Sequence, residues 1–520
     1  MPAGILALAL AASFAAAPPP LKLTRAGYRD RVHAAWLGQI IGTLAGFQFE
    51  GKVASSSRVL VDRFPRRYDA APVDDDYYYE LVALRAFEKH GIGLTLDQLG
   101  RQWKENSAGT WGSSEQTRLA QARGVPGSEA GHPRHNRLWW TIGPQFSADI
   151  FGLLAPGDPN LAGRLARAYG HINGYAEGTD GAVFVAGMVS LAFRETDSRA
   201  IVREAAKLIH PSSPYRQCLD MVIGMAGAGK SAEEVFQAVE DRWRLEYPAM
   251  NNGVPNGGLV AASVWFGGGD YLTSVNLAFR AADFSDADCN AANAGAVVGA
   301  MHGTKALPGE LVESLGDRIR GATMGGVALT PPVDESIADI ARRTAALGER
   351  MLAANGATVA GDAITVHPRP VETQLAELFG TADLARYWNP EWRLERAGLG
   401  GIAAAGCPRM TFLDGGVLAT WPRDEARGAL FRRTVTLGAS PALEIEVAAD
   451  SGCAWRLEVY VDNANAFGSL IEGAGRNQWR KLTVDFAPFA GREVEIRVYQ
   501  RTALPDRASG NAYWRALTLR

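Results

Sequence analysis

The spacing of apolar residues divides the chain into two parts with different periodicity. From about residue 28 to residue 355, apolar positions recur every three or four residues, as in Val32, Ala35, Trp36, Ile40 and Leu44, which is the spacing of amphipathic helices. After residue 400, apolar and polar residues alternate in runs such as 443–447, 456–461, 482–486 and 494–499. Such runs, separated by glycine and aspartate turns, are typical of a β-sandwich. The sequence therefore predicts helices first and strands second.

The length of the chain also favours two domains. A single hydrophobic core stops growing near roughly 250 to 300 residues, and the chain has 520. We expect an all-α domain over residues 22–355 and a β-sandwich over residues 400–520. The stretch between them, residues 356–399, contains Pro368, Pro370 and Pro390, and prolines of this kind mark a connector.

Composition and charge exclude several classes of protein. Hydrophobic residues make up 47% of the chain and charged residues 21%, which is ordinary for a globular protein. The formal net charge is -3, and no run of lysine or arginine is longer than a pair. Since such a chain offers no basic surface for a phosphate backbone, nucleic acid is not an expected partner.

The N-terminal residues resemble an export signal. Residues 5–17 are apolar but too few to span a bilayer, and Ala15-Ala16-Ala17 before Pro18 fits a small-residue cleavage site. We expect residues 1–17 to be a signal peptide, and the mature chain to be secreted or periplasmic with no membrane segment. The cysteines are too widely spaced for a zinc motif or a disulfide framework: Cys218, Cys289, Cys407 and Cys453.

Two predicted helices carry a glycine at every fourth position. These glycines are Gly38, Gly42 and Gly46 in one helix, and Gly295, Gly299 and Gly303 in the other. A spacing of four places each trio on one helix face, where the missing side chains let two backbones approach closely. Close helix packing is the simplest interpretation of the glycines alone.

Acidic residues gather at the ends of three predicted helices. Asp74-Asp75-Asp76 precedes the helical run 79–88, Asp286-Ala287-Asp288 opens the second glycine-bearing helix, and Glu50 closes the first. A single aspartate is an ordinary helix cap, but adjacent carboxylates raise each other's pKa unless a cation neutralises them. Mg²⁺ and Mn²⁺ prefer such oxygen ligands. A shared cation site and three separate caps are both open on this pattern.

Together these segments resemble the motifs of the ADP-ribosylglycohydrolase family. Gly38–Glu50 resembles the family's glycine-rich helix with a metal-binding Glu, Val73–Tyr77 its Thr-Asp-Asp-Thr segment, and Asp286–Cys289 its Asp-Thr-Asp-Thr segment. The resemblance implies an all-α domain with orthogonally packed helices. It also implies one or two Mg²⁺ or Mn²⁺ ions per chain, held by Glu50, Asp74, Asp75, Asp76, Asp286 and Asp288.

The resemblance also suggests residues that line a substrate pocket. His171, followed by Asn173-Gly174, is similar to the family's substrate-lining His and glycine loop, and Gln145 and Asp149 lie in a segment similar to its pocket-lining helix. For Gln145 and Asp149 a core or surface role is equally open. The expected substrate contacts also include Tyr77, Asn256, Cys289 and Asn290.

The sequence departs from the family pattern at four positions. Thr43 stands where an Asp is usual, Asp74 and Tyr77 replace the two threonines of the middle motif, and Cys289 replaces the last Thr. These changes affect metal binding less than substrate identity. The sequence is most similar to a secreted branch of the family with an Asp-Asp-Asp motif and an additional β domain.

The β region resembles a jelly-roll, galactose-binding-like domain. Its tryptophans would suggest sugar stacking if they were exposed, whereas core packing is the default interpretation: Trp421, Trp455, Trp479 and Trp514. The resemblance as a whole implies a secreted, metal-dependent glycohydrolase that cleaves at the anomeric carbon of a ribosyl or other furanosyl sugar. Its substrate would be a glycan or a ribosyl-containing small molecule, with Glu50 and Asp75 as catalytic residues. A non-catalytic glycan-binding or structural protein and a true ADP-ribosyl-protein hydrolase are the alternatives.

Overall fold

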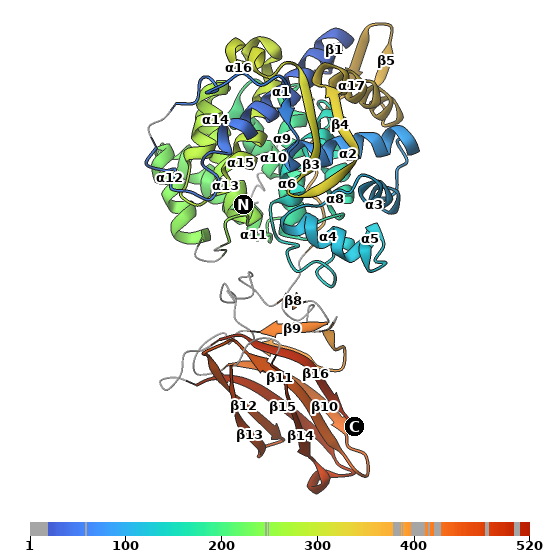
Figure 1. The fold of residues 1–520 in the computed structure, drawn as a ribbon, viewed down its shortest axis with the longest axis vertical. Coiled ribbons are helices and arrows are strands. Elements are labelled where there is room, and N and C mark those ends of the chain that lie inside the picture. Colours follow the sequence, from blue (N-terminus) through green and yellow to red (C-terminus); the bar gives the residue numbers. More distant parts are fainter. Residues whose placement is uncertain are drawn as a thin grey trace, which may run out of the picture.

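The computed structural model describes residues 19–57, 60–244, 247, 249–377, 386, 388–396, 411–413, 416–420, 428–473, 478–503 and 510–520. Figure 1 shows a helical body formed by the first part of the chain and a β body formed by the last. The two bodies have separate hydrophobic cores, one centred on residues such as Trp36 and the other on residues such as Trp455. The predicted order of a helical domain followed by a β-sheet domain is therefore confirmed.

The expected signal peptide, residues 1–17, lies outside the described residues. Within the described residues, no helix combines the length and the apolar character needed to cross a membrane.

The helical body contains seventeen α-helices in the described residues. They are α1 Arg25–Gly46, α2 Asp75–His90, α3 Leu96–Glu105, α4 Gly112–Ala122, α5 Gly127–Ala130, α6 Gly143–Phe146, α7 Asp149–Leu153, α8 Pro159–Gly170, α9 Glu177–Ala192, α10 Ser198–Ala206, α11 Pro214–Gly227, α12 Ala232–Val239, α13 Gly253–Gly267, α14 Tyr271–Arg280, α15 Ala287–His302, α16 Gly309–Ser314 and α17 Ile337–Ala354. Helices α9, α13 and α15 are buried along nearly their whole length, so the other helices pack around them.

Local sequence explains where many of these helices begin. The Thr24 side chain accepts a hydrogen bond from the Gly27 amide at the start of α1, and the Ser336 side chain accepts one from the Asp339 amide at the start of α17. At α3, Thr95 and Gln98 satisfy each other's backbone amides in a capping box. These side chains replace the hydrogen bonds that the first turn of a helix lacks.

Helices α1 and α15 pack with their backbones in direct contact. A Cβ atom added at Gly42 would collide with the carbonyl oxygen of Ala291, and one at Gly46 would lie 2.5 Å from that of Ala287. Gly38 and Gly295 face each other in the same way. The glycines therefore serve the close packing that their spacing indicates. Gly303 does not belong to this face, because it follows α15 as its C-cap with φ +77°.

Two small sheets complete the helical body. One joins β1 Leu21–Thr24, β6 Ala363–Val366 and β5 Thr358–Ala360, and the other joins β2 Ala71–Pro72, β3 Arg318–Met324 and β4 Val327–Ser336. The first of these sheets contains part of the segment that we expected to be a connector.

The expected connector, residues 356–399, divides between the two bodies. Beyond β6 the chain continues along the helical body, where the Asn160 side-chain amide donates to Pro370 O at 2.8 Å and the Gln374 amide donates to Leu208 O at 2.9 Å. Further on, Trp388 and Trp392 pack into the core of the β body. We therefore propose that the helical domain extends to about residue 377 and that the β domain begins near residue 386.

The β body is a sandwich of two five-stranded antiparallel sheets. One has the order β13-β12-β15-β10-β7 and the other the order β14-β11-β16-β9-β8. Alternate side chains of both sheets, such as Val459 and Ile445, point into the shared core. The strands are β7 Arg393–Arg396, β8 Thr411–Leu413, β9 Val417–Thr420, β10 Ala429–Thr436, β11 Ala442–Ala449, β12 Ala454–Val461, β13 Ala464–Glu472, β14 Arg480–Asp485, β15 Glu493–Thr502 and β16 Ala512–Leu519.

The tryptophans of the sandwich serve mainly its core. Trp455 and Trp514 are buried, with ring centroids 5.3 Å apart. Trp479 is partly buried, and the Arg515 guanidinium lies 4.1 Å from its ring centroid. Trp421 lies outside the described residues. Core packing is therefore the role of Trp455 and Trp514.

We expect residues 386–520 to fold as an isolated fragment and residues 400–520 to be much less stable. The shorter fragment lacks β7 and Trp392, whose indole Nε1 donates to Leu517 O at 3.1 Å. Loss of a buried tryptophan alone costs about 3 kcal/mol or more. Thermal unfolding followed by circular dichroism compares the two fragments. A disordered spectrum for residues 386–520 would show that the sandwich depends on the helical domain.

Candidate metal centre

The first acidic cluster lies at the start of α2. Asp74 is the N-cap residue, and its side chain accepts a hydrogen bond from the Asp76 amide at 3.2 Å. Asp75 and Asp76 form the first turn, where the helix dipole favours negative charge. Asp76 is fully buried, and the Thr43 hydroxyl of α1 donates to its Oδ2 at 2.8 Å. Thr43, a departure from the family pattern, therefore orients one carboxylate of the cluster.

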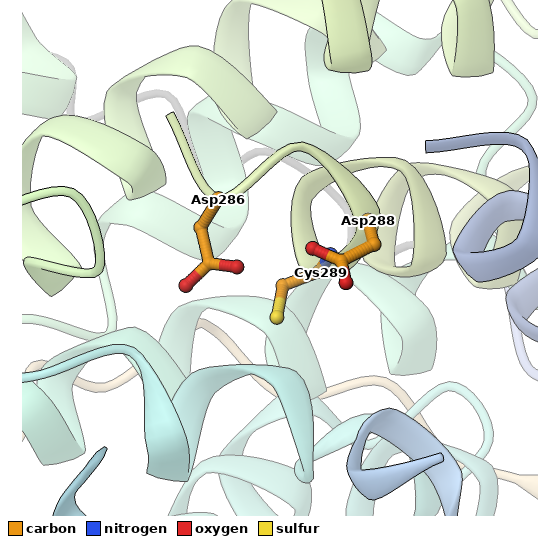
Figure 2. A group of neighbouring side chains, drawn as sticks. All are labelled: Asp286, Asp288 and Cys289. Atoms are coloured by element: carbon orange, nitrogen blue, oxygen red, sulfur yellow. The ribbon is translucent and has the colours of Figure 1, made fainter. Parts of the chain in front are cut away.

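The second acidic cluster lies at the start of α15. Figure 2 shows that Asp286 comes from the loop before the helix, whereas Asp288 and Cys289 come from its first turn. Asn256 fixes this loop, because its Oδ1 accepts hydrogen bonds from the Asp286 amide at 3.4 Å and from the Asn290 side chain at 3.0 Å. Asp286 and Asp288 are 5% and 6% exposed, so the cluster lies almost wholly out of solvent.

We predicted that Glu50 ends a helix, but it lies in the turn that follows α1. Helix α1 stops at Gly46, and the Phe47 amide still bonds to Thr43 O at its C-cap. The Gly51 amide then donates to Ser285 O at 3.1 Å. This bond ties the Glu50 turn to the residue immediately before Asp286, so the helix end and the second cluster meet through the backbone.

The three acidic segments open into one cavity of about 400 Å³. Five of the six predicted metal ligands line it: Glu50, Asp74, Asp75, Asp286 and Asp288. Asp76 lies behind this surface, and Cys289 forms part of the wall. The fold therefore brings the three acidic segments to one cavity, and they are not three separate helix caps.

Burial raises the pKa of every acid in the cluster, and repulsion from neighbouring acids adds to this effect at all of them except Asp286. Burial is the largest cause for Glu50, whose pKa rises to about 7 with further contributions from Asp286 and Asp74. Burial, Asp74 and Asp76 raise the pKa of Asp75 well above its ordinary value, and burial, Asp286 and Asp76 do the same for Asp288. The folded protein therefore holds these carboxylates together against a substantial electrostatic cost.

The donor set fits a divalent cation. Within each of two groups, Asp74–Asp76 and Asp286 with Asp288 and Cys289, one ligand atom per residue lies within 4.8 Å of the others. Asp76 Oδ1 is buried and has no hydrogen-bond partner among the described residues, and no lysine, arginine or histidine is among the described residues that line the cavity. A hard cation would neutralise this cluster of oxygen ligands.

Most of the predicted substrate contacts lie behind the cavity wall. The Asn173 side chain donates to the Ser114 hydroxyl at 2.9 Å, and Ser114 lines the cavity. Gln145 accepts a hydrogen bond from the Tyr215 hydroxyl at 2.8 Å, and Asp149 accepts one from Asn293 at 2.9 Å. Cys289 is the only predicted substrate contact in the described cavity lining. The other predicted contacts do not belong to it: His171, Asn173, Gly174, Gln145, Asp149, Tyr77, Asn256 and Asn290.

His171 is held away from the cavity by the end of the helical domain. Its Nε2 lies 2.8 Å from Glu377 Oε1, and its ring stacks on Tyr175 with centroids 5.1 Å apart. Gly174 packs against Pro144, where an added Cβ would collide with the ring. Tyr77 is buried, and its hydroxyl donates to Pro72 O. These contacts give all three residues structural partners in this conformation.

Several wall residues were missing from the sequence analysis. They come from the N-cap and first turn of α4, the segment around α6 and the loop before α13: Trp111, Gly112, Ser113, Ser114, Thr141, Ile142, Gly143, Phe146, Met250 and Asn251, with Phe47 from the turn after α1. The available signal was the stretch from Gly109 to Ser114, which contains two glycines and two serines. Such stretches often let a backbone approach a ligand.

We expect Cys289 to make the two groups of ligands unequal in their affinity for a cation. Burial, Asp286 and Asp76 raise the pKa of its thiol well above the ordinary value, so the thiol remains neutral, and a neutral thiol is a poor Mg²⁺ ligand. We expect one tight cation near Asp74–Asp76 and Asp288, and a weak one near Glu50 and Asp286.

We expect Cys289→Thr to tighten only the weaker cation site, by about tenfold, because a hydroxyl oxygen replaces the thiol. Calorimetric titration with Mg²⁺ measures both sites. Cys289→Val is the matched control, since it has the shape of threonine without the hydroxyl. Equal tightening by valine, or two equally tight sites in the wild type, would contradict the argument.

The acidic residues at the meeting helix ends of this α-helical domain form a site that could hold a divalent cation. The family comparison agrees, because the ADP-ribosylglycohydrolase family model matches residues 24–353. The chain belongs to the ADP-ribosylglycohydrolase family. The resemblance in the sequence motifs is thereby confirmed.

The solved structures that resemble the chain are distant. An ADP-ribosylglycohydrolase-related protein complex is 19% identical, with a TM-score of 0.40, and the match covers 62% of this chain and 98% of that one. The β region matches the EclA C-terminal domain, a sugar-binding protein, at 18% identity and TM-score 0.16, over 19% of this chain and 71% of that one. It also matches a carbohydrate-binding module from Clostridium perfringens solved with methyl-galactose, at 17% identity and TM-score 0.17, over 25% of this chain and 88% of that one. No curated protein matches the chain.

Proposed function

We propose that this chain is a secreted or periplasmic glycohydrolase that requires Mg²⁺ or Mn²⁺ and cleaves a glycosidic bond at the anomeric carbon of a ribosyl or other furanosyl sugar. The observation that carries the proposal is the convergence of Glu50, Asp74, Asp75, Asp286 and Asp288 on one cavity. The cavity is of the size that binds small molecules, and membership of the family supports a glycohydrolase-type activity.

Glu50 is suited to the role of general base. Its pKa of about 7, raised mainly by burial and then by Asp286 and Asp74, lies close to neutral pH, where a carboxylate can both accept and return a proton. Glu50 would take the proton from the attacking water at its carboxylate oxygen. When bound, a divalent cation polarises the sugar oxygens and the water that it holds.

Asp75 would hold the sugar in place from the opposite cluster. Its carboxylate lines the cavity, where it can accept a hydrogen bond from a sugar hydroxyl. Negative charge on both sides of the sugar also stabilises the positive charge that develops on the ring in an oxocarbenium-like transition state. The chain thus supplies a base, a positioning group and electrostatic stabilisation.

Two alternatives to this function are a non-catalytic protein and a true ADP-ribosyl-protein hydrolase. A non-catalytic protein on this fold would have no reason to retain a cluster of repelling, buried carboxylates, so these acids argue against it. A true ADP-ribosyl-protein hydrolase is the candidate favoured by membership of the family. Metal dependence is common to that candidate and to our proposal, whereas the substrate separates them.

A hydrolysis screen tests the proposal. The purified protein is incubated with ADP-ribosyl, ribofuranosyl, arabinofuranosyl and pyranosyl substrates in the presence of Mg²⁺, Mn²⁺ or a chelator. We expect turnover of at least one furanosyl substrate that stops with the chelator and in the Glu50→Gln variant. Turnover that survives the chelator would refute metal dependence, and inactivity toward every substrate would refute the proposed activity.

A further inference from the structure

The cavity wall opposite the acids is built from neutral groups. Hydrogen-bonding side chains come from Ser113, Ser114, Thr141 and Asn251, and apolar surface comes from residues such as Trp111. The Ser113 hydroxyl is 1% exposed and has no hydrogen-bond partner among the described residues. Hydroxyl and amide groups of this kind suit the hydroxyls of an uncharged sugar, because each can both donate and accept a hydrogen bond.

Charge on the cavity disfavours an anionic ligand. Asp76 lies behind the five cavity-lining carboxylates, and two divalent cations would neutralise only four of these six negative charges. Relative to the family motifs, Asp74 adds one carboxylate where a threonine is usual and Thr43 removes one where an aspartate is usual. No lysine, arginine or histidine among the described lining residues offsets the remaining negative charge. A pyrophosphate would therefore enter a region that remains negative, at a cost that low dielectric increases.

The positively charged side chains of Arg244 and Lys52 have other partners, although Arg244 Nη2 is buried with no hydrogen-bond partner among the described residues. Arg244 forms an ion pair with Glu240 at 3.3 Å and donates to Ala249 O at 2.8 Å. The Lys52 ammonium donates to Gln48 O at 2.8 Å. Neither residue belongs to the described cavity lining, so neither forms the charged clamp that phosphate recognition usually employs.

The N-terminus of α4 also reaches the cavity but does not reverse this charge. Its first residues, Gly112, Ser113 and Ser114, line the wall, and a helix N-terminus is equivalent to only about half a positive charge. Glu115 lies in the same first turn and opposes that charge. The amides of this turn can donate to neutral hydroxyl oxygens equally well.

Trp111 forms an aromatic platform on the cavity wall. It is the N-cap residue of α4 and is 49% exposed. Gly325, in the β3–β4 turn with φ +52°, packs so closely against it that an added Cβ would lie 2.6 Å from Trp111 Cζ2. The turn therefore supports one edge of the indole, while the exposed part of the ring remains available to the cavity. An aromatic face of this kind can pack against the apolar face of a sugar ring.

We infer that the cavity binds an uncharged glycoside whose sugar ring stacks on Trp111, and that it discriminates against the pyrophosphate of ADP-ribose. This inference rests on the proposed function, because it specifies the substrate class of the same site. Trp111 is then a specificity-determining residue, and the serine, threonine and asparagine side chains of the wall recognise the sugar hydroxyls.

Calorimetry on the full-length, Mg²⁺-loaded protein tests the ligand preference. The probes are methyl ribofuranoside, methyl arabinofuranoside and methyl galactofuranoside as neutral ligands, and ADP-ribose as the charged one. We expect at least one neutral glycoside to bind tenfold or more tightly than ADP-ribose, with an affinity that does not change between low and high salt. Equal or tighter binding of ADP-ribose, or binding of no neutral glycoside, overturns the inference.

Variants of Trp111 test the platform. Trp111→Ala should weaken binding of the neutral glycoside about tenfold or more, because its stacking surface is lost, whereas Mg²⁺ affinity should stay unchanged. Trp111→Phe retains an aromatic face and should restore most of the affinity. Unchanged binding in Trp111→Ala would overturn the assignment. Metal-dependent hydrolysis of a ribofuranosyl or arabinofuranosyl substrate by a protein whose binding does not depend on Trp111 would leave the proposed function intact and refute this inference alone.

Discussion

Asp75→Ala and Asp288→Ala should each abolish hydrolysis and weaken Mg²⁺ or Mn²⁺ binding by at least ~100-fold, without unfolding the protein. Each residue contributes a carboxylate to the shared cavity, and its removal relieves repulsion from the neighbouring acids that raise its pKa. Thermal stability without metal should therefore stay the same or rise. Calorimetric metal titration and the hydrolysis screen measure the two losses.

Asp339→Ala is the control for these variants. Asp339 also lies in the first turn of a helix, α17, but its carboxylate pairs with Arg342 at the surface, far from the cavity lining. The Asp339→Ala variant should bind Mg²⁺ or Mn²⁺ with the same affinity as the wild type. If Asp75→Ala or Asp288→Ala also bound Mg²⁺ or Mn²⁺ like the wild type, the metal centre would be wrongly placed.

The metal-free protein should lose stability as the pH rises from about 5 to 8. Burial and neighbouring acids raise the pKa of Glu50 from 4.5 to about 7, so between these values the folded state keeps a proton that the unfolded state releases. Stability is highest below the unfolded pKa and falls as the pH rises through the folded one. Asp75, Asp76 and Asp288 shift in the same direction. We expect the Tm in EDTA to fall by about 5 °C.

Saturating Mg²⁺ or Mn²⁺ should remove most of this pH dependence, because a bound cation stabilises the ionised carboxylates. Differential scanning calorimetry at several pH values, with EDTA or metal, gives the comparison. Glu50→Gln is the matched control: it keeps the shape of the side chain without its titration, so the pH dependence in EDTA should be shallower. A Tm in EDTA that rises over the same range would contradict the predicted burial of these acids.

The order of the two domains could be predicted because each has its own periodicity over a long stretch of sequence. The glycine spacing also identified the contact between α1 and α15, since only missing side chains permit such an approach. The domain boundary was harder to predict. β6 pairs with β1, more than 300 residues earlier in the chain, and Trp392 packs under β16. Both contacts depend on distant partners that local proline content does not reveal.

The acidic half of the candidate site was visible in the sequence because its residues cluster in short motifs at helix ends. The opposite wall was not visible. It is assembled from three separate segments, at the start of α4, around α6 and before α13, and a tryptophan such as Trp111 has no local pattern that separates exposure from burial. The similarity of His171 to a substrate-lining residue could not reveal Glu377, which occupies its Nε2 from a segment about 200 residues away.

The backbone contact between α1 and α15 has a consequence for how this protein could diversify. Gly46 and Ala287 touch each other and adjoin Phe47 and Asp286 in the sequence, so the direct backbone contact between α1 and α15 determines the relative position of two acidic segments. Changes there would displace ligands and destabilise the fold together. The loops that carry Trp111, Thr141 and Asn251 are not under this constraint. New substrate preferences could therefore be obtained by exchanging those loops while the cation-binding half remains fixed.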